Sequence, residues 1–227
     1  MLRNVLEKLW RFASRHVWSL SLALASGAMF AQLARELAEN ELGDFDSAVS
    51  GWLRARRGCC DQPMWALTWL GTFDRLAAIT ALAAAALLLA KRAREAIYVT
   101  VCALGACVLC GGLKAFFQRA RPDIALKYVI AMPDSFSFPS GHAMGSFVVL
   151  GALVVVVFAL RAPRAVRAVA AVCGLVTAFG VAVSRVYFGV HYPSDVVGGQ
   201  LAGAAWIAAV TGWFYPRLLP AETSGTP

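Results

Sequence analysis

Long apolar segments separated by short polar ones dominate the pattern of hydrophobic positions along this chain. A helix needs about 20 apolar residues to cross a lipid bilayer, and six segments approach that length. The pattern therefore predicts an all-α polytopic membrane protein, built as a bundle of six transmembrane helices joined mostly by short loops. The expected spans cover residues 17–35, 72–90, 96–117, 142–160, 165–186 and 195–215.

The first of these segments follows a basic tail, and in this respect it also looks like a signal peptide. Its apolar stretch runs from Val17 to Ala34, which is longer than the apolar core of a usual signal peptide. We therefore interpret it as an uncleaved first span.

The segment 39–71 is too polar to span and is expected to lie on the outer membrane surface. Part of it, 45–57, predicts an amphipathic helix, because its apolar residues recur with the spacing of one helix face. These positions are Phe45, Val49, Trp52 and Leu53, followed by Arg56. The apolar piece 63–73 is expected to lie on the surface in the same way. A lid-like loop without a role toward a substrate is the alternative.

The composition supports a membrane protein and excludes several other classes. Of the 227 residues, 59% are hydrophobic and 15% are charged, whereas a soluble domain is about half apolar and a quarter charged. These values argue against a soluble globular, disordered, collagen-like or disulfide-stapled protein. Six spans leave no room for a second soluble domain, so we expect one domain over residues 1–227.

The net charge of +8 would suggest a nucleic-acid ligand in a soluble protein. In a membrane protein, Lys and Arg instead collect in the cytoplasmic loops and orient the helices. Here they divide almost evenly between the two faces, but the loops around 91–94 and 161–167 are short and strictly basic. Both termini are therefore expected inside. Arg54, Arg56 and Arg57, on the outer side, are the main evidence against this orientation.

Three polar clusters lie at the ends of the predicted spans, where charged groups are costly and often functional. They are KAFFQRARP at Lys114–Pro122, FPSGH at Phe138–His142, and SRVYFGVHYPSD at Ser184–Asp195. No crossing separates the first cluster from the second, and two crossings separate the second from the third. All three are therefore expected on one face of the membrane, as parts of a single site.

The basic residues of these clusters suit a phosphate group. Lys114, Arg121 and Arg185 can neutralise phosphate oxygens, arginine through its planar fork and lysine as a point charge. Ser140 and Gly141 read as a helix start, where free backbone N–H groups bind anions. Alternatively, Lys114 and Arg121 are interface residues that reach toward water, and Ser140 is only a helix cap.

The titratable residues complete an inventory for phosphoryl transfer. His142 and His191 can serve as acid and nucleophile, and Asp195, four residues after His191, can hold its tautomer. Plain interfacial histidines are the alternative. A zinc site formed by His142, His191 and Asp195 is the chemical rival, but the three nearby cations would repel a dication. We therefore predict neither a metal nor a cofactor.

The three clusters together resemble the signature of the type 2 phosphatidic acid phosphatase superfamily. They have the forms K-x6-RP, PSGH and SR-x5-H-x3-D, in the family's order and spacing, between Lys114 and Asp195. The family includes lipid phosphate phosphatases, bacterial phosphatidylglycerophosphate and undecaprenyl diphosphate phosphatases, glucose-6-phosphatase and vanadium haloperoxidases. Haloperoxidases are soluble and much larger, so the hydropathy of this chain favours a lipid phosphatase.

The resemblance implies a role for each signature residue, without a metal or other cofactor. His191 would be the nucleophile, Asp195 the residue that orients it, and His142 the acid for the leaving group. Five residues would bind the phosphate: Lys114, Arg121, Ser140, Gly141 and Arg185. The region 114–195 is thus the expected catalytic signature region.

The implied function is a membrane phosphatase that removes the terminal phosphate of a lipid through a phosphohistidine intermediate. Undecaprenyl diphosphate, phosphatidylglycerophosphate and phosphatidate are the expected substrates, and the motifs do not separate them. Membrane lipids, and no nucleic acid, are the expected partners. The expected location is the bacterial inner membrane, with the site facing the periplasm. The alternatives are an anion or lipid transporter, which would show midplane charges or broken helices, and a catalytically inactive lipid-binding relative.

Overall fold

The computed structural model describes residues 2–123 and 135–218, and the elements in these ranges are all helices. Helices α4 to α8 follow the apolar segments of the sequence closely, and α1 extends beyond the first one at both ends. The helices are α1 (Leu2–Ala38), α2 (Gly43–Arg54), α3 (Asp61–Leu70), α4 (Phe73–Leu89), α5 (Ala93–Phe117), α6 (Gly141–Ala159), α7 (Arg164–Tyr187) and α8 (Pro193–Leu218).

Within this part of the chain, five helices are long and apolar enough to cross a membrane. They are α1 from His16 onward, α5, α6, α7 and α8. Helices α3 and α4 pass the same test together, as a pair bent by 56°, and bring the number of spans to six if the pair is one span. The prediction of an all-α bundle of membrane-spanning helices is confirmed. The sequence placed the second span at 72–90 and did not anticipate the bend that joins it to α3.

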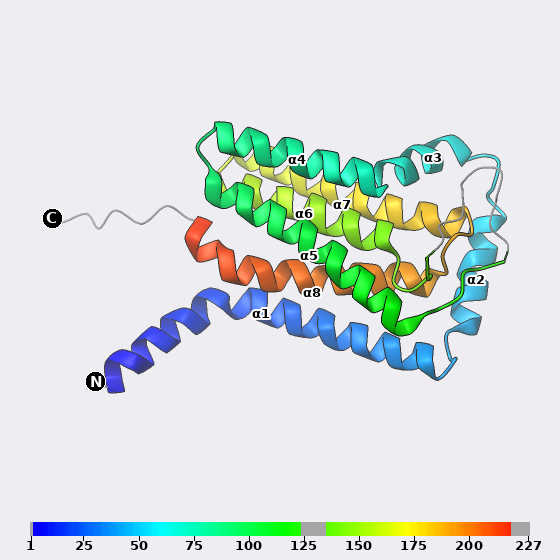
Figure 1. Cartoon of the computed structure of the whole chain (residues 1–227), viewed down its shortest axis with the longest axis horizontal. Coiled ribbons are helices and arrows are strands. Elements are labelled where there is room, and N and C mark those ends of the chain that lie inside the picture. Colours follow the sequence, from blue (N-terminus) through cyan, green and yellow to red (C-terminus); the bar gives the residue numbers. More distant parts are fainter. Residues whose placement is uncertain (1, 124–134, 219–227) are drawn as a thin grey trace.

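Helix α6 lies at the centre of the bundle, in contact with α4, α5, α7 and α8, while α1 runs along α8 (Figure 1). Helix α2 lies across one end of the bundle. At that end α5 and α7 finish and α6 and α8 begin. The start of α1 and the end of α8 lie at the opposite end, so both ends of the described chain share one side.

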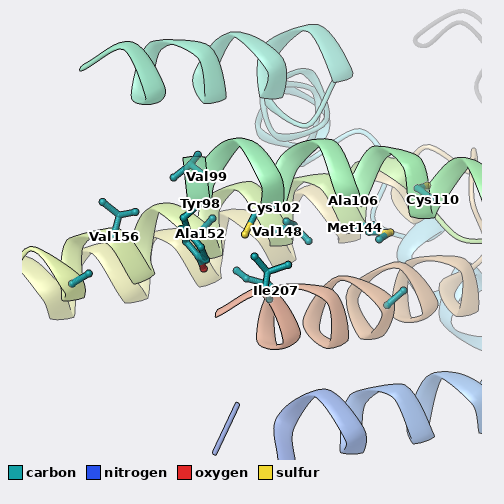
Figure 2. Packing of buried hydrophobic residues seen from close by; sticks show 13 residues of the cluster. Tyr98, Val99, Cys102, Ala106, Cys110, Met144, Val148, Ala152, Val156 and Ile207 are labelled. Carbon is teal, nitrogen blue, oxygen red and sulfur yellow. The ribbon is translucent and has the colours of Figure 1, made fainter. Parts of the chain in front are cut away.

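The main core lies where α5, α6 and α8 meet (Figure 2). Its buried residues recur at the spacing of one helix face. Many of them are small, which allows close contact between helices, and close packing contributes strongly to helix association within a membrane. The stripe on α6 consists of Met144, Val148, Ala152, Val156 and Ala159.

Polar contacts also hold the first half of α5 and the second half of α8 together. The Tyr98 hydroxyl lies 2.8 Å from Thr211 Oγ1, and Trp206 Nε1 donates to the Cys102 carbonyl at 2.9 Å. Near the other end, an added Cβ at Gly199 would lie 2.6 Å from the Ser140 carbonyl oxygen. Only glycine permits this approach, which brings the start of α6 against α8.

Candidate active site

The three polar clusters of the sequence meet at the end of the bundle that α2 crosses. The first follows α5, the second precedes α6, and the third connects α7 to α8. Ser140 N donates to the Asp195 carbonyl at 2.9 Å, which joins the second cluster to the third. Part of the connection between α5 and α6, residues 124–134, lies outside the described residues, and no predicted site residue falls within it.

His191 and Asp195 form a buried pair. His191 lies in the short connection before α8, and Asp195 lies in the first turn of that helix. His191 Nδ1 is 3.3 Å from Asp195 Oδ2. The same carboxylate oxygen accepts hydrogen bonds from Tyr192 N, at 2.9 Å, and from the Ser137 hydroxyl. These contacts fix the orientation of the carboxylate toward the imidazole.

The other ring nitrogen of His191 faces a cation. Arg121 Nη1 lies 3.1 Å from His191 Nε2. An arginine can only donate hydrogen bonds, so Nε2 is the acceptor and the ring proton sits on Nδ1, toward Asp195. This tautomer leaves the Nε2 lone pair facing Arg121, one of the cations predicted to bind phosphate.

Burial lowers the pKa of His191 from 6.5 to about 4. The positive charges of Arg185 and Arg121 act in the same direction, whereas the contact with Asp195 acts in the opposite one. The imidazole is therefore neutral at neutral pH. A neutral imidazole is the nucleophilic form.

Two of the predicted phosphate ligands, at the end of α5 and just after it, contact residues 135–137 in front of α6. Lys114 Nζ donates to the carbonyls of Phe136 and Ser137. Arg121 Nε donates to the Ser135 carbonyl at 2.8 Å, and its Nη1 also reaches the Val190 carbonyl. The C-terminal end of α5 and the loop before α6 are thereby tied to the connection that carries His191.

The other two side chains predicted to bind phosphate, Arg185 and Ser140, are buried, and each has a polar atom without a hydrogen-bond partner among the described residues. Arg185 is 2% exposed and donates through Nη1 to Thr68 on α3. Among the described residues, neither Arg185 Nε nor the fully buried Ser140 hydroxyl has a hydrogen-bond partner. Buried polar groups nearly always have partners, so these atoms suit a bound anion. Ser140 occupies the N-cap position of α6 as predicted, yet its side chain makes no capping bond.

His142 lies in the first turn of α6 and borders an apolar groove. This cavity, of about 470 Å³, is formed by α4, α5, α6 and the α3–α4 bend. Gly71, at the bend, packs so closely that an added Cβ would lie 2.3 Å from Val181 Cγ1 and 3.3 Å from His142 Cδ2. A glycine is therefore required where the bend meets the acid candidate. Gly141, the last predicted phosphate ligand, lines the same groove.

A family model, that of the PAP2 superfamily, matches residues 94–218, more than half of the chain, and this range includes all the residues predicted for the site. The chain belongs to the PAP2 superfamily. It is thus a multi-pass membrane enzyme of a family of metal-independent lipid phosphatases.

The chain is similar to several characterised PAP2 enzymes. It is 27% identical over 189 residues to phosphatidylglycerophosphatase B of Bacillus subtilis (strain 168), covering 81% of this chain and 90% of that protein. It is 40% identical over 76 residues to the undecaprenyl-diphosphatase of Sulfolobus acidocaldarius, covering 34% and 32% of the two chains. The crystal structure of a transmembrane PAP2-type phosphatidylglycerolphosphate phosphatase from Bacillus subtilis superposes with a TM-score of 0.77, at 26% identity, and covers 86% of this chain and 96% of that one.

The PAP2 signature does not account for all the polar residues at this site. Arg119, Asp46, Ser137 and Thr68 contact signature residues or join that network, and the sequence did not single them out. Arg119 belongs to the first cluster, and its charge near the end of a span could have marked it as a candidate functional residue. Asp46 is one of several polar residues in the predicted amphipathic helix, and nothing in the sequence distinguishes it as part of the site.

Helix α2 lies within the segment predicted to be an interfacial helix, and its buried face includes a polar residue, Asp46, that is not part of the apolar pattern. Asp46 and Leu53 are buried, whereas Phe45 and Trp52 are exposed. The physical reason is that Asp46 has buried partners on the loop after α5 and at the start of α8. Within residues 2–123 and 135–218, no three His, Cys, Asp or Glu side chains are placed to hold a metal ion together.

Proposed function

We propose that this PAP2 enzyme hydrolyses the terminal phosphate of a membrane lipid through a phosphohistidine formed on His191. The observation that carries the proposal is the orientation of that imidazole. Its Nδ1 faces Asp195, and its unprotonated Nε2 faces Arg121 among the cations. A neutral nucleophile held beside positive charge is what attack on a phosphate requires.

In the first step, the phosphate is held by the Lys114, Arg121 and Arg185 cations, with the Ser140 hydroxyl and the N–H groups at the start of α6 around it. His191 Nε2 forms a bond to phosphorus, and the bond from phosphorus to the lipid oxygen breaks. His142 gives its proton to the leaving oxygen, which departs as an alcohol or, from a diphosphate, as a monophosphate. The Asp195 carboxylate stabilises the positive charge that develops on the imidazole.

In the second step, water replaces the lipid. His142, now deprotonated, accepts a proton from the water as its oxygen bonds to phosphorus. The bond from phosphorus to Nε2 breaks, and its electron pair returns to the imidazole. Phosphate leaves, and His142 is protonated again for the next cycle.

The groove beside His142 supports a lipid as the leaving group. Its walls are mostly apolar and include Phe73, Leu76 and Val149, so the departing oxygen and the chain attached to it lie next to a surface suited to hydrocarbon. Phosphatidylglycerophosphate is the first substrate to test. The two Bacillus subtilis comparisons that cover 81% and 86% of this chain are both named for activity on that lipid. Undecaprenyl diphosphate and phosphatidate are the other candidates.

We also infer that the site faces the periplasm of a bacterial inner membrane. The start of α1 and the end of α8 share the end of the bundle opposite the site (Figure 1). The basic connections at 91–94 and 161–167, between α4 and α5 and between α6 and α7, belong to that same end. Short basic loops favour the cytoplasm.

Phosphate release by the detergent-purified protein tests the proposal. Phosphatidylglycerophosphate, undecaprenyl diphosphate and phosphatidate are supplied separately, with EDTA present, and His191→Ala is assayed alongside. We expect release that survives EDTA, disappears in the variant, and is fastest with phosphatidylglycerophosphate. Release that EDTA stops, or that His191→Ala retains, would contradict the mechanism. Activity on soluble sugar phosphates alone would contradict the lipid substrate.

A further inference from the structure

The guanidinium of Arg119 joins two buried carboxylates from different parts of the chain. Its Nη1 lies 2.6 Å from Asp195 Oδ1, and its Nη2 lies 2.7 Å from Asp46 Oδ2. The side chains of Asp195 and Asp46 are 0% and 5% exposed. Charge-assisted hydrogen bonds of this length are among the stronger polar contacts in proteins. Arg119 therefore connects the proposed catalytic pair to helix α2.

Asp46 extends this connection to the start of α8. Its Oδ1 accepts from Ser194 N at 2.8 Å, and its Oδ2 accepts from the Ser194 hydroxyl at 2.7 Å. A carboxylate at this place satisfies a free N–H of the first turn and interacts favourably with the helix dipole. Asp46 thus holds the turn that carries Asp195, although it belongs to a helix far away in sequence.

Arg119 also determines how Asp195 faces His191. Asp195 Oδ2 takes the contacts with His191, Tyr192 and Ser137, whereas Oδ1 has Arg119 as its one hydrogen-bond donor among the described residues. Without Arg119 the carboxylate would lose the contact that sets its rotation. A buried lone pair would also be left without a donor.

A phosphate ligand is the other role open to a cation here, and the contacts of Arg119 argue against it. Both terminal nitrogens are bound to carboxylates, and the guanidinium lies 4.0 Å from the centre of the Tyr192 ring. Arg121, in contrast, contacts the imidazole, and neither Arg121 nor Arg185 has a carboxylate partner among the described residues. Arg119 acts on the reaction through Asp195.

The charges explain why two carboxylates share one arginine. Arg119 paired with Asp195 alone would neutralise the negative charge that His191 needs behind it. Asp46 adds a second negative charge, so the three side chains together carry a net charge of −1. That charge favours the cationic imidazole that forms when Nε2 bonds to phosphorus.

We propose that Arg119 and Asp46 are positioning residues for the His191–Asp195 pair, and that α2 is a structural part of the active site. Arg119 fixes the carboxylate, and Asp46 fixes Arg119 and the start of α8. This inference rests on the proposed role of His191 as the nucleophile.

Chemical rescue tests the role of Arg119. We expect Arg119→Ala to lower kcat by roughly 10- to 100-fold, as loss of an outer contact to a catalytic group does, with little change in KM. A cavity of about 650 Å³ has Arg119 and Asp46 in its wall, so added guanidinium ions can enter and restore part of kcat. Methylammonium should restore less, because it cannot bridge two carboxylates. Arg119→Lys should recover only part of the activity for the same reason.

Arg35→Ala is the matched control, because Arg35 also pairs with a carboxylate, Glu39, but on the exposed surface of α1. It should keep wild-type kcat. Thermal unfolding of each variant separates a lost contact from a lost fold. Wild-type kcat in Arg119→Ala would overturn the inference. So would a loss that guanidinium leaves unchanged in a protein that melts as the wild type does.

The conservative variant Asp46→Asn tests the charge. It retains an oxygen for Ser194 and removes the second negative charge, so we expect a smaller loss of kcat than in Arg119→Ala, with KM unchanged. Unchanged kcat would overturn the role of Asp46. If His191→Ala is inactive while the Arg119 and Asp46 variants turn over normally, this inference fails and the proposed function stands. If His191→Ala remains active, the proposed function itself fails.

Discussion

His191 and His142 both lie near Arg121 and Arg185, the proposed phosphate ligands, but their surroundings differ strongly. His191 is enclosed by Asp195, Ser137 and Arg121, with a further layer of charged groups behind Asp195. The ring of His142 has no hydrogen bond within the described ranges, and it borders an apolar groove that leads away between helices α4 and α5. One side of the site is held in place by polar contacts, and the other is open to hydrocarbon.

The difference follows from the two tasks. A nucleophile must keep one nitrogen and one tautomer aimed at phosphorus, which requires fixed partners. The acid must meet a leaving oxygen that arrives on a lipid, which requires an accessible apolar surface. In the proposed mechanism, the signature residues act on the phosphate. We expect the choice among lipids to depend on the groove, whose described wall includes two signature residues, Gly141 and His142.

The largest effect short of removing the nucleophile is expected on the enclosed side. Asp195→Asn should lower kcat by about 10⁴-fold, because the amide favours the wrong tautomer of His191. The melting temperature should fall while unfolding remains cooperative, since the side chain keeps its size but loses its charged contact with Arg119. Phosphate release and a melting curve on the same preparation check both points. Wild-type turnover would show that Asp195 only starts helix α8.

On the open side, the effect should depend on the leaving group. His142→Ala should lower kcat with a lipid phosphate by roughly 10²- to 10⁴-fold, the usual contribution of a general acid. With a p-nitrophenyl phosphate ester, whose leaving group needs no proton, the rate of the first turnover should be much less affected, because only the later water step then lacks His142. Equal losses of the first-turnover rate with both substrates would show that His142 does not protonate the leaving oxygen.

Replacing Arg121 or Arg185 by lysine should lower activity even though the positive charge is kept. Arg121→Lys and Arg185→Lys should each lower kcat/KM by roughly 10²-fold, because the lysine loses the planar fork that matches a phosphate. Steady-state kinetics on the lipid substrate measures this. Near-normal rates would mean that positive charge alone suffices at these positions.

The apolar groove can be filled at one glycine of α5 without a steric clash. Gly111 lines the groove, and a Cβ added there has nothing within 4 Å. We expect Gly111→Leu to raise KM for a long-chain lipid phosphate by about tenfold, with no change for a short-chain soluble ester.

Gly112 provides the control for this substitution. A Cβ added there is equally free of contacts, but the residue is not part of the groove wall. Gly112→Leu should therefore retain the wild-type KM for both substrates. The same rise in KM in both variants would place the lipid chain elsewhere.

The smallest expected change is in the titration of His191. Burial together with Arg185 and Arg121 lowers its pKa to about 4, despite the opposing effect of Asp195. Because the lowered pKa keeps the ring deprotonated, we expect no titration from neutral pH down to about 5. NMR of ¹⁵N-histidine protein, with the resonance assigned by His191→Gln, measures this. A midpoint near the ordinary value of 6.5 would contradict the burial and charges described for the enclosed side.

Much of the architecture could be predicted from the sequence, because membrane spans and paired motifs are local signals. The apolar blocks marked α4 to α8 to within a few residues, and counting crossings placed Lys114, His142 and His191 on one face. The bend between α3 and α4 was missed, because it depends on the close approach of Gly71 to Val181 on another helix. That contact exists only after the bundle has packed.

The polar network of Asp195, Arg119 and Asp46 also depends on tertiary packing and could not be predicted from the sequence. Arg119 and Asp46 are 73 residues apart in the chain, and no spacing rule connects them. The apolar spacing of α2 marked Leu53 and not Asp46, because periodicity records hydrophobicity and not the buried partner that an aspartate will find. The groove was also missed, since it arises from the packing of three helices and not from a motif.

The most direct test of the account is a rapid-quench experiment on His142→Ala with a ³²P-labelled nitrophenyl ester of phosphate. The enclosed side is intact in this variant, so attack by His191 should proceed, while the water step lacks its base. We predict a burst of nitrophenol equal to the enzyme concentration and an acid-labile labelled protein. The burst and the labelled protein should both be absent in the double variant that combines His142→Ala with His191→Ala. Continued turnover with neither a burst nor labelled protein would mean that water attacks phosphorus directly, and would contradict the central claim that His191 carries the phosphoryl group.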